Sequence, residues 1–518
     1  MSSSTTSVQH PEASPSVGVG NAYDLELIAN VRPPGWENPL PRNPYHLLVI
    51  GAGPAGLIAA RTAAMLGARV ALIERDRLGG DSLNYASVPT KTIIRTSRNY
   101  ADMRNAVNFG VEPPAQINLN FALAMDRVRR IRARISRSMA ATRLTDLGVD
   151  LYFGAARFIG PDAVDVGGVC LRFAKAMVAT GSQPKPVTIP GLTECGFIHT
   201  AEGFELTALP QSILVIGGGP GGCEGAQTFA RLGARTIIAM TEPLFLPGEE
   251  RDAAHMVSDA LARDGVEIHL NTKAAEVRIQ GDRKVVDLVN DGDVSTVTVD
   301  VILVGTGRVP VVDGLALDAA GIAYTNEAGI RVDDFLRTTN PRVYAAGDVC
   351  LDHKFTTTAY ASGRLVVRNA LFPRRKRMSS LTIPWCTYTD PEIAHVGLYV
   401  RQARERDIPV KTFTVPMHDV DRAILDGEDS GFVKIHVRDG SDKILGATIV
   451  ARHAGEMINE ISLAMVAGIG LQKLAQVVRA YPTQAEAIRM AAEHYNETRL
   501  TPLRRWLLRR WLHRSGRE

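Results

Sequence analysis

The 518-residue chain is predicted to be an α/β protein in three parts, because one β–turn–α–β unit is written twice and the pattern changes after about residue 379. Residues 45–74 read YHLLVIGAGPAGLIAARTAAMLGARVALIE, and residues 212–240 read SILVIGGGPGGCEGAQTFARLGARTIIAM. In each copy a β-branched apolar run leads into a glycine cluster, a helical pattern follows, and a second apolar run closes the unit. After residue 379, alternating strands and two helical runs predict a separate C-terminal α/β domain.

The glycine spacing of each copy suits a dinucleotide pyrophosphate. Gly51 makes the tight turn out of the strand, Gly53 lets the backbone approach the phosphates, and Gly56 lets the helix pack on the strand. The equivalent glycines of the second copy are Gly217, Gly219 and Gly222. The helix N-terminus, with its free N–H groups, then holds the phosphates. We therefore predict two Rossmann-like dinucleotide-binding domains.

The two copies end differently, which predicts different ligands. Glu74 closes the first copy, where a carboxylate accepts hydrogen bonds from a ribose 2′-hydroxyl. Met240 stands at the equivalent position of the second copy and cannot bind a ribose in that way. It also removes a charge that would repel a 2′-phosphate, although no arginine follows to hold one. We expect FAD at the first copy and NADH or NADPH at the second. The alternative for Met240 is a methionine that fills core space.

Three further segments end strands with glycine. Residues 175–186 and 301–310 each run into Thr-Gly and a proline turn, at Gly181 and Gly307, as expected where the chain crosses between two nucleotide domains. Residues 342–350, RVYAAGDVC, form a strand that ends at Gly347 and Asp348. We expect Asp348 to hydrogen-bond the ribityl chain of a flavin.

Composition excludes several other classes of protein. The formal net charge is only +4 and the charges are interspersed, so nucleic acid is not expected as a partner. No apolar run reaches the roughly 18 residues of a membrane span. The first 20 residues have no basic start and no apolar core, so they do not form a secretory signal. The five cysteines form no CxxC pair, which favours reduced thiols and a cytoplasmic location. No metal site is expected.

With these motifs in order, the chain resembles the class I pyridine nucleotide–disulfide oxidoreductases over roughly residues 44–498. It is most similar to the mercuric-reductase-like branch, through PWCTYTDPEIAHVGL at 384–398 and YPTQAEAIRMAAEHYNETRLTP at 481–502. The resemblance implies FAD, a nicotinamide dinucleotide and a homodimer. It also implies an FAD-binding domain at 44–190 and 310–376, an NAD(P)-binding domain at 191–309 and a dimerisation domain at 377–499. Composition predicts the two ends: a disordered tail at 1–43, which begins rich in Ser, Thr, Pro and Gly, and a basic Trp/Arg tail at 500–518.

The sequence departs from the family in the stretch GGDSLNYASVPTK, residues 79–91. The family carries its two redox cysteines at the positions of Ser82 and Ser87. Disulfide chemistry needs a thiolate with a pKa near 8.5 or lower that can also form an S–S bond. A serine hydroxyl can only hydrogen-bond. The chain also lacks the C-terminal cysteine pair of mercuric reductases, so reduction of mercury or of a disulfide is the less expected activity.

Other catalytic positions of the family are kept or altered. Lys91 resembles the lysine beside the flavin, and Glu224 resembles its ion-pair partner beside the nicotinamide. Tyr481 and Glu486 occupy the acid–base pair, with tyrosine where many members have histidine. Tyrosine donates a hydrogen bond but is a poor general base near neutral pH.

The C-terminal segment PLRRWLLRRWLHRSGR alternates arginine pairs with Trp506 and Trp511. It suits a weak contact with an anionic membrane surface. Arginines interrupt the apolar arc of the helical wheel, which favours the alternative of a surface helix packed on its own domain.

Three functions follow. The first is an FAD-dependent NAD(P)H oxidoreductase that passes electrons from the flavin to a small acceptor, namely a quinone, an electrophile or oxygen. The second is a catalytically retired FAD-binding dimer with a binding or regulatory role. The third keeps disulfide chemistry through Cys223, Cys350 or Cys386. We favour the first.

Overall fold

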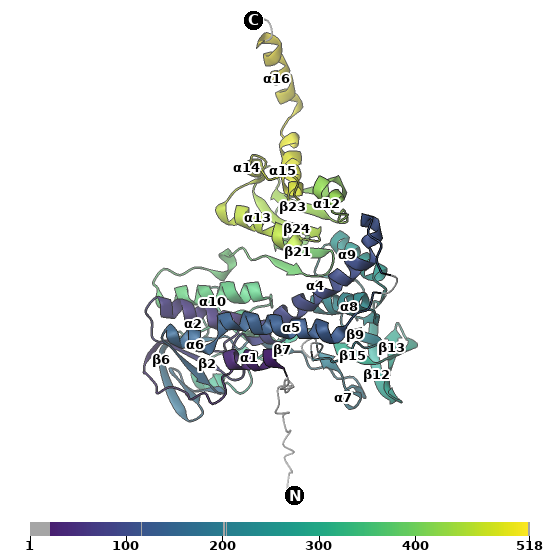
Figure 1. The fold of residues 1–518 in the computed structure, drawn as a ribbon. Coiled ribbons are helices and arrows are strands. Elements are labelled where there is room, and N and C mark those ends of the chain that lie inside the picture. The colour runs from purple at the N-terminus through teal and green to yellow at the C-terminus, as the bar shows by residue number, and fades with distance from the viewer. Residues whose placement is uncertain (1–20, 115–116, 200–202, 204, 516–518) are drawn as a thin grey trace.

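The computed structural model describes residues 21–114, 117–199, 203 and 205–515. Two nucleotide-binding domains lie side by side, and the C-terminal domain lies on them (Figure 1). The predicted class, two Rossmann-like domains with a C-terminal α/β domain, is confirmed. No helix within the described ranges is long and apolar enough to cross a lipid bilayer.

The first domain is built on a seven-stranded sheet in the order β3-β2-β1-β6-β5-β4, with β19 paired to β6. Its strands are β1 (Tyr45–Ile50), β2 (Val70–Glu74), β3 (Val149–Phe153), β4 (Ala156–Gly160), β5 (Ala163–Val166), β6 (Val169–Val178) and β19 (Val343–Ala345). β1, β2, β3, β6 and β19 run parallel, whereas β4 and β5 pair antiparallel with their neighbours. Because β19 joins β6, the chain returns to the first domain after the second is complete.

Helices cover this sheet and extend towards the second domain. They are α1 (Ala22–Val31), α2 (Pro54–Met65), α3 (Gly80–Asn84), α4 (Ser87–Arg104), α5 (Phe121–Ser136), α6 (Ala141–Asp146) and α10 (Thr356–Leu371). α2 begins with proline, whose fixed φ suits the first helical position. α10 packs on α2 although about 300 residues separate them in sequence (Figure 1).

The second domain repeats the plan. Its five parallel strands lie in the order β11-β10-β9-β15-β8: β8 (Ile198–His199), β9 (Ser212–Ile216), β10 (Arg235–Ala239), β11 (Val266–His269) and β15 (Val301–Val304). Its helices are α7 (Leu192–Cys195), α8 (Pro220–Leu232) and α9 (Arg251–Arg263). An antiparallel sheet is added by β12 (Thr272–Gln280), β13 (Arg283–Asn290) and β14 (Asp293–Val299). Two strand pairs complete these domains: β7 (Ser182–Pro184) with β16 (Arg308–Pro310), and β17 (Tyr324–Thr325) with β18 (Gly329–Ile330).

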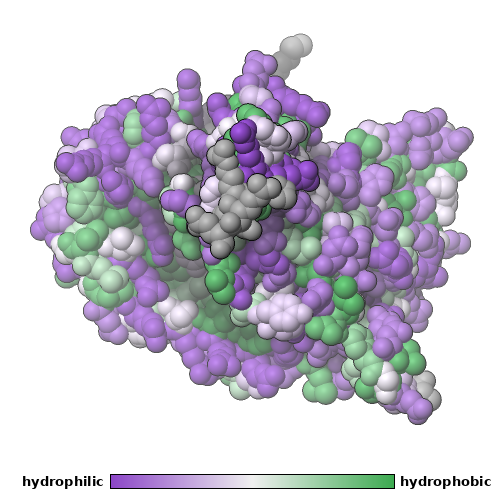
Figure 2. Space-filling model, turned by 90° about the horizontal axis from the view of Figure 1, so that it is seen from above, coloured by the Kyte–Doolittle hydropathy of each residue, from purple (hydrophilic) through white to green (hydrophobic). Residues whose placement is uncertain are grey.

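The C-terminal domain is an antiparallel sheet in the order β20-β21-β24-β23-β22. The strands are β20 (Trp385–Thr387), β21 (Glu392–Gly397), β22 (Val410–Pro416), β23 (Phe432–Arg438) and β24 (Ile444–Ala451). The helices are α11 (Val400–Arg404), α12 (Asp421–Leu425), α13 (Ala454–Ala467), α14 (Leu471–Leu474), α15 (Glu486–Thr498) and α16 (Pro502–Ser515). Viewed from above, this end of the molecule is mostly hydrophilic, with hydrophobic residues gathered in a hollow (Figure 2).

Two expectations about the chain ends need correction. The tail expected at residues 1–43 contains α1, whose Leu27 and Val31 are fully buried in the core of the first domain. Residues 1–20 lie outside the described residues. At the other end, residues 502–512 of α16 are all exposed, which differs from the expected helix packed on its own domain. The sequence pattern predicted a helix here but does not determine which parts of the protein the helix contacts.

Candidate active site

The start of α4 carries two of the predicted site residues. Ser87 is the first residue of α4 and Lys91 follows one turn later. Residues four apart lie on one face of a helix, so the two side chains point to the same side. Ser87 meets α10 and Lys91 meets α8. One helical turn therefore joins two chemically different clusters.

The first cluster is the predicted ion pair. Lys91 Nζ lies 2.8 Å from Glu224 Oε2, and the Glu224 side chain is only 7% exposed. The backbone N–H of Tyr388 donates to Glu224 Oε1 over 2.9 Å. The ammonium group of Lys91 also lies 4.8 Å from the centre of the Tyr388 ring. The two side chains that the resemblance pairs are therefore in contact, and their roles beside the flavin and the nicotinamide stay predictions. Tyr388, which contacts both partners, was missed: it lies in the 384–398 motif, but the sequence there does not indicate what its backbone or ring contacts.

The second cluster is a chain of three hydroxyls. Thr356 Oγ1 lies 3.3 Å from Ser82 Oγ and 3.1 Å from Ser87 Oγ. Thr356 opens α10 and is 269 residues from Ser87 in sequence. Thr356, which the sequence pattern did not predict, thus bridges the two positions at which the resemblance implies redox cysteines. We call Ser82, Thr356 and Ser87 the hydroxyl trio.

No cysteine pair replaces the trio. All five cysteines, which fall in the described ranges, are free thiols. Burial raises the pKa of Cys223, Cys350 and Cys386, so each favours the protonated thiol. The contacts of these three sulfurs are with oxygen atoms, such as the Gly218 carbonyl that lies 3.4 Å from Cys223 Sγ. The alternative that kept disulfide chemistry through these residues has no support in their geometry.

The first glycine cluster fits a dinucleotide. A Cβ on Gly51 would lie 2.4 Å from the Ala179 carbonyl oxygen, and one on Gly56 would lie 1.8 Å from the Gly51 oxygen. Gly53 faces more open space and caps α2 without any side-chain hydrogen bond. The free N–H groups of α2 are therefore accessible to a phosphate. Glu74 is buried at the end of β2, where its carboxylate accepts from the backbone N–H groups of Ala52 and Asp76. Burial raises the pKa of Glu74.

The second glycine cluster repeats this geometry, with one difference. A Cβ on Gly217 or Gly222 would meet backbone oxygen within 2.5 Å, while Gly219 has nothing within 4 Å. Met240 is 2% exposed and packs beneath Gly218 in the hydrophobic core. The space-filling alternative for Met240 thus describes its packing in the structure.

The other predicted cofactor residues lie where the two domains join. Asp348 Oδ2 accepts a hydrogen bond of 2.7 Å from the Ser182 hydroxyl, and burial raises the pKa of Asp348. Arg308 donates to the same hydroxyl over 2.7 Å and pairs with Asp81. Positive φ angles are found at the three glycines of these turns: Gly181, Gly307 and Gly347. This polar cluster fits a hydroxylated chain such as ribityl.

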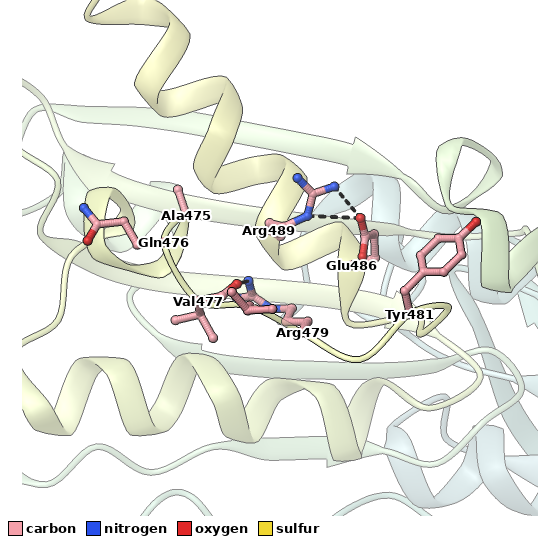
Figure 3. Close-up of a pocket in the computed structure, with 8 residues that line it drawn as sticks. Ala475, Gln476, Val477, Arg479, Tyr481, Glu486 and Arg489 are labelled. Carbon is pink, nitrogen blue, oxygen red and sulfur yellow. Dashed lines mark hydrogen bonds and ion pairs between the residues drawn. The ribbon is translucent and has the colours of Figure 1, made fainter.

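Tyr481 and Glu486 do not form the expected pair. The Tyr481 hydroxyl donates to Asp421 Oδ2 over 2.6 Å. Arg489 binds Glu486 at 3.0 Å, and Tyr481 lies apart from this pair (Figure 3). Both line a pocket of about 340 Å³ in the C-terminal domain, and Tyr481 is 70% exposed. Bonding to Asp421 raises the pKa of Tyr481. Within one chain, no described contact joins this pocket to the hydroxyl trio or to the ion pair.

Known proteins match nearly the whole folded chain. The sequence family described as pyridine nucleotide-disulphide oxidoreductase matches residues 45–363, and its dimerisation domain matches residues 383–492. The mercuric reductase of Streptomyces lividans is 32% identical over 87% of this chain and 96% of its own length. The dihydrolipoyl dehydrogenase of Geobacillus stearothermophilus is 31% identical over 86% of this chain and 95% of its own.

Solved structures agree with these relatives. LpdA from Mycobacterium tuberculosis superposes with a TM-score of 0.80 at 27% identity, covering 87% of this chain and 99% of its own. The HOCl-induced flavoprotein disulfide reductase RclA from Escherichia coli gives 0.77 at 28% identity, with the same coverage. These matches confirm the predicted cofactor classes, FAD and NAD(P)H, and the dimerisation domain supports the predicted homodimer. The chain belongs to the pyridine nucleotide–disulphide oxidoreductase family.

Proposed function

We propose that this protein is an FAD-dependent NAD(P)H oxidoreductase whose electron acceptor is a small molecule other than a disulfide. A quinone, a small electrophile and oxygen are the acceptor classes that fit. One observation carries the proposal. The hydroxyl trio stands where the resemblance places two redox cysteines, while the Lys91–Glu224 ion pair is kept at 2.8 Å.

The residues divide the work of such a reaction. When bound, FAD would supply two-electron redox chemistry between the nicotinamide and the acceptor. Lys91 supplies a positive charge at the position where the resemblance places the flavin ring, and Glu224 holds the ammonium group of Lys91 in place. The hydroxyls of Ser82 and Ser87 can donate to or accept from a carbonyl of the acceptor. They cannot carry electrons, because a hydroxyl has no disulfide-like oxidised partner.

An anaerobic titration of the purified holoprotein tests the proposal. We expect the flavin absorbance to bleach with NADH or NADPH. We also expect a quinone, an electrophilic dye or oxygen to restore the absorbance faster than lipoamide, glutathione disulfide or Hg(II). Turnover of one of those last three substrates at the rate of ordinary family members would overturn the proposal. Thiol counting before and after reduction is the control, with no gain of free thiols expected.

The retired flavoprotein is the second candidate function. Two observations favour it: the core packing of Met240, and the Tyr481 hydroxyl that is bonded to Asp421 instead of Glu486. The same titration separates the two functions. A protein that retains FAD but shows no bleaching with either nicotinamide would be a binding or regulatory dimer.

A further inference from the structure

Helix α16 carries a basic repeat. Residues 504–508 read RRWLL and residues 509–513 read RRWLH. The five arginines of α16 exceed the formal net charge of the whole chain, +4, and no acidic residue lies between residues 499 and 515. Whatever binds this helix must therefore accept a dense positive charge.

The same helix leaves large apolar side chains in water. The exposed fractions are 65% for Leu503, 52% for Trp506, 51% for Leu507 and 64% for Trp511. Exposed apolar side chains that are contiguous mark a site of interaction. α16 lies at the far end of the molecule, beyond α15, where nothing stands between it and a large partner (Figure 1).

The spacing along α16 sorts part of this mixture onto two sides. Leu503, Leu507 and Trp511 are four residues apart, so they form one apolar ridge. Arg505 and Arg509 are also four apart, and at 100° per residue their ridge lies opposite the apolar one. Arg504 and Arg510 flank the apolar ridge, whereas Leu508 and Leu512 lie on the side of Arg505 and Arg509. A long arginine side chain can lay its stem on apolar surroundings while its guanidinium stays in a polar layer.

We propose that α16 docks the protein on an anionic lipid bilayer, lying in the plane of the headgroups. Lipid phosphates meet the arginines that flank the apolar ridge, and the acyl boundary takes the ridge itself, Leu503, Leu507 and Trp511. Tryptophan favours this depth because its ring is apolar and its N–H is polar. The guanidinium of Arg510 lies 5.3 Å from the centre of the Trp506 ring, which places a cation and an indole side by side.

Two other occupants satisfy only half of the surface. A nucleic acid would bind the arginines and leave the leucines in water. A second α16 would cover the leucines and bring two sets of five arginines together. Residues 499–501 separate α15 from Pro502, which opens α16, so α16 is a separate helix and not an extension of α15.

Co-sedimentation of the full-length holoprotein with vesicles tests the proposal. The vesicles are pure phosphatidylcholine or phosphatidylcholine with 30% phosphatidylglycerol, and duplex DNA is assayed in parallel. We expect binding to the anionic vesicles, at least tenfold weaker binding to the neutral ones, and loss of binding as salt is raised. Equal binding to both vesicle types, or none to either, would overturn the proposal.

Paired variants assign the binding to α16. Arg504→Gln with Arg510→Gln, at the two arginines that flank the apolar ridge, should lower the partition coefficient ~30-fold, since each basic residue near an anionic surface contributes about a factor of five. The matched control is Arg374→Gln with Arg375→Gln, two exposed arginines of a loop in the body of the protein. The control should bind as the parent does. An equal loss in the control would mean that net charge alone drives binding.

A second variant separates the lipid from other occupants. Leu503→Gln with Leu507→Gln should weaken vesicle binding while leaving flavin content and dimer size unchanged. DNA binding that survives this change and is lost in the arginine variant would assign α16 to nucleic acid instead. A chain ending at residue 501 that becomes monomeric would assign α16 to the partner subunit.

Discussion

The hydroxyl trio and the Lys91–Glu224 pair meet α4 one helical turn apart, at Ser87 and at Lys91, yet different interactions hold them. The ion pair is charged, and its carboxylate is buried and bound from two sides. The trio is neutral and joined by hydrogen bonds of 3.1 and 3.3 Å. Removing one partner of a buried charge pair leaves an unpaired charge, whereas a hydroxyl loses a weaker bond. The difference implies that losing a partner costs more stability at the ion pair than at the hydroxyl trio.

The largest expected effect comes from making the trio redox-active. Ser82→Cys with Ser87→Cys places two sulfurs where Thr356 now bridges two hydroxyls. We expect two additional free thiols per chain after two-electron reduction, and activity with a disulfide substrate that the parent lacks. Ser82→Cys alone is the control and should gain no such activity. A double variant without new thiols on reduction would show that the two positions are too far apart for a bond.

Removal of the charge on the other side of α4 ranks second. Lys91→Met leaves Glu224 buried without its partner, so flavin reduction by NADH or NADPH should slow by about 100-fold. The free energy of unfolding should fall by about 2 kcal/mol, because Glu224 loses its partner. Partial exposure of Lys91 to solvent keeps this loss below that of a fully buried ion pair. Stopped-flow reduction and denaturant titration measure the two effects. Lys91→Arg keeps the charge and should lose less in both; an unchanged rate in Lys91→Met would contradict the role of the pair.

A smaller effect is expected at the threonine that joins the serines. Thr356→Val keeps the side-chain volume and removes two hydrogen bonds, so the free energy of unfolding should fall by about 1 kcal/mol. The neighbouring Thr357 is exposed, so Thr357→Val should change the free energy of unfolding by less than about 0.5 kcal/mol. The rate of flavin reduction should stay within a factor of about three of the parent rate. A loss as large as that in Lys91→Met would show that the hydroxyl trio and the ion pair act as one functional unit.

The smallest effect is expected at the thiol near the ion pair. Burial raises the pKa of Cys386, so its thiolate fraction at pH 8 is below that of an ordinary cysteine. Alkylation of Cys386 in the native protein should be slow at pH 8 and should accelerate only at higher pH. Cys386→Ser should leave flavin reduction unchanged. Rapid alkylation at pH 8, followed by loss of activity, would show that the thiol of Cys386 takes part in the reaction.

The sequence by itself determined the features that depend on neighbours along the chain. Turn, strand and helix propensities are local, so the two β–α–β units could be predicted. The need for glycine at positions 51 and 56, where a Cβ would clash with backbone oxygen, could be predicted for the same reason. The absence of sulfur at residues 82 and 87 also follows from the sequence alone, because both residues are serine. The Lys91–Glu224 pairing came from the family resemblance and not from the residue pattern.

Only the tertiary structure decided which distant groups meet. Thr356 contacts Ser82 across 274 residues of sequence, Tyr481 bonds Asp421 across 60, and Met240, which follows β10, packs under Gly218. The exposure of α16 belongs to the same class, because a helical pattern gives the faces of a helix and not their neighbours. Such contacts arise from the packing of whole elements, and single-residue preferences along the chain carry no information about them.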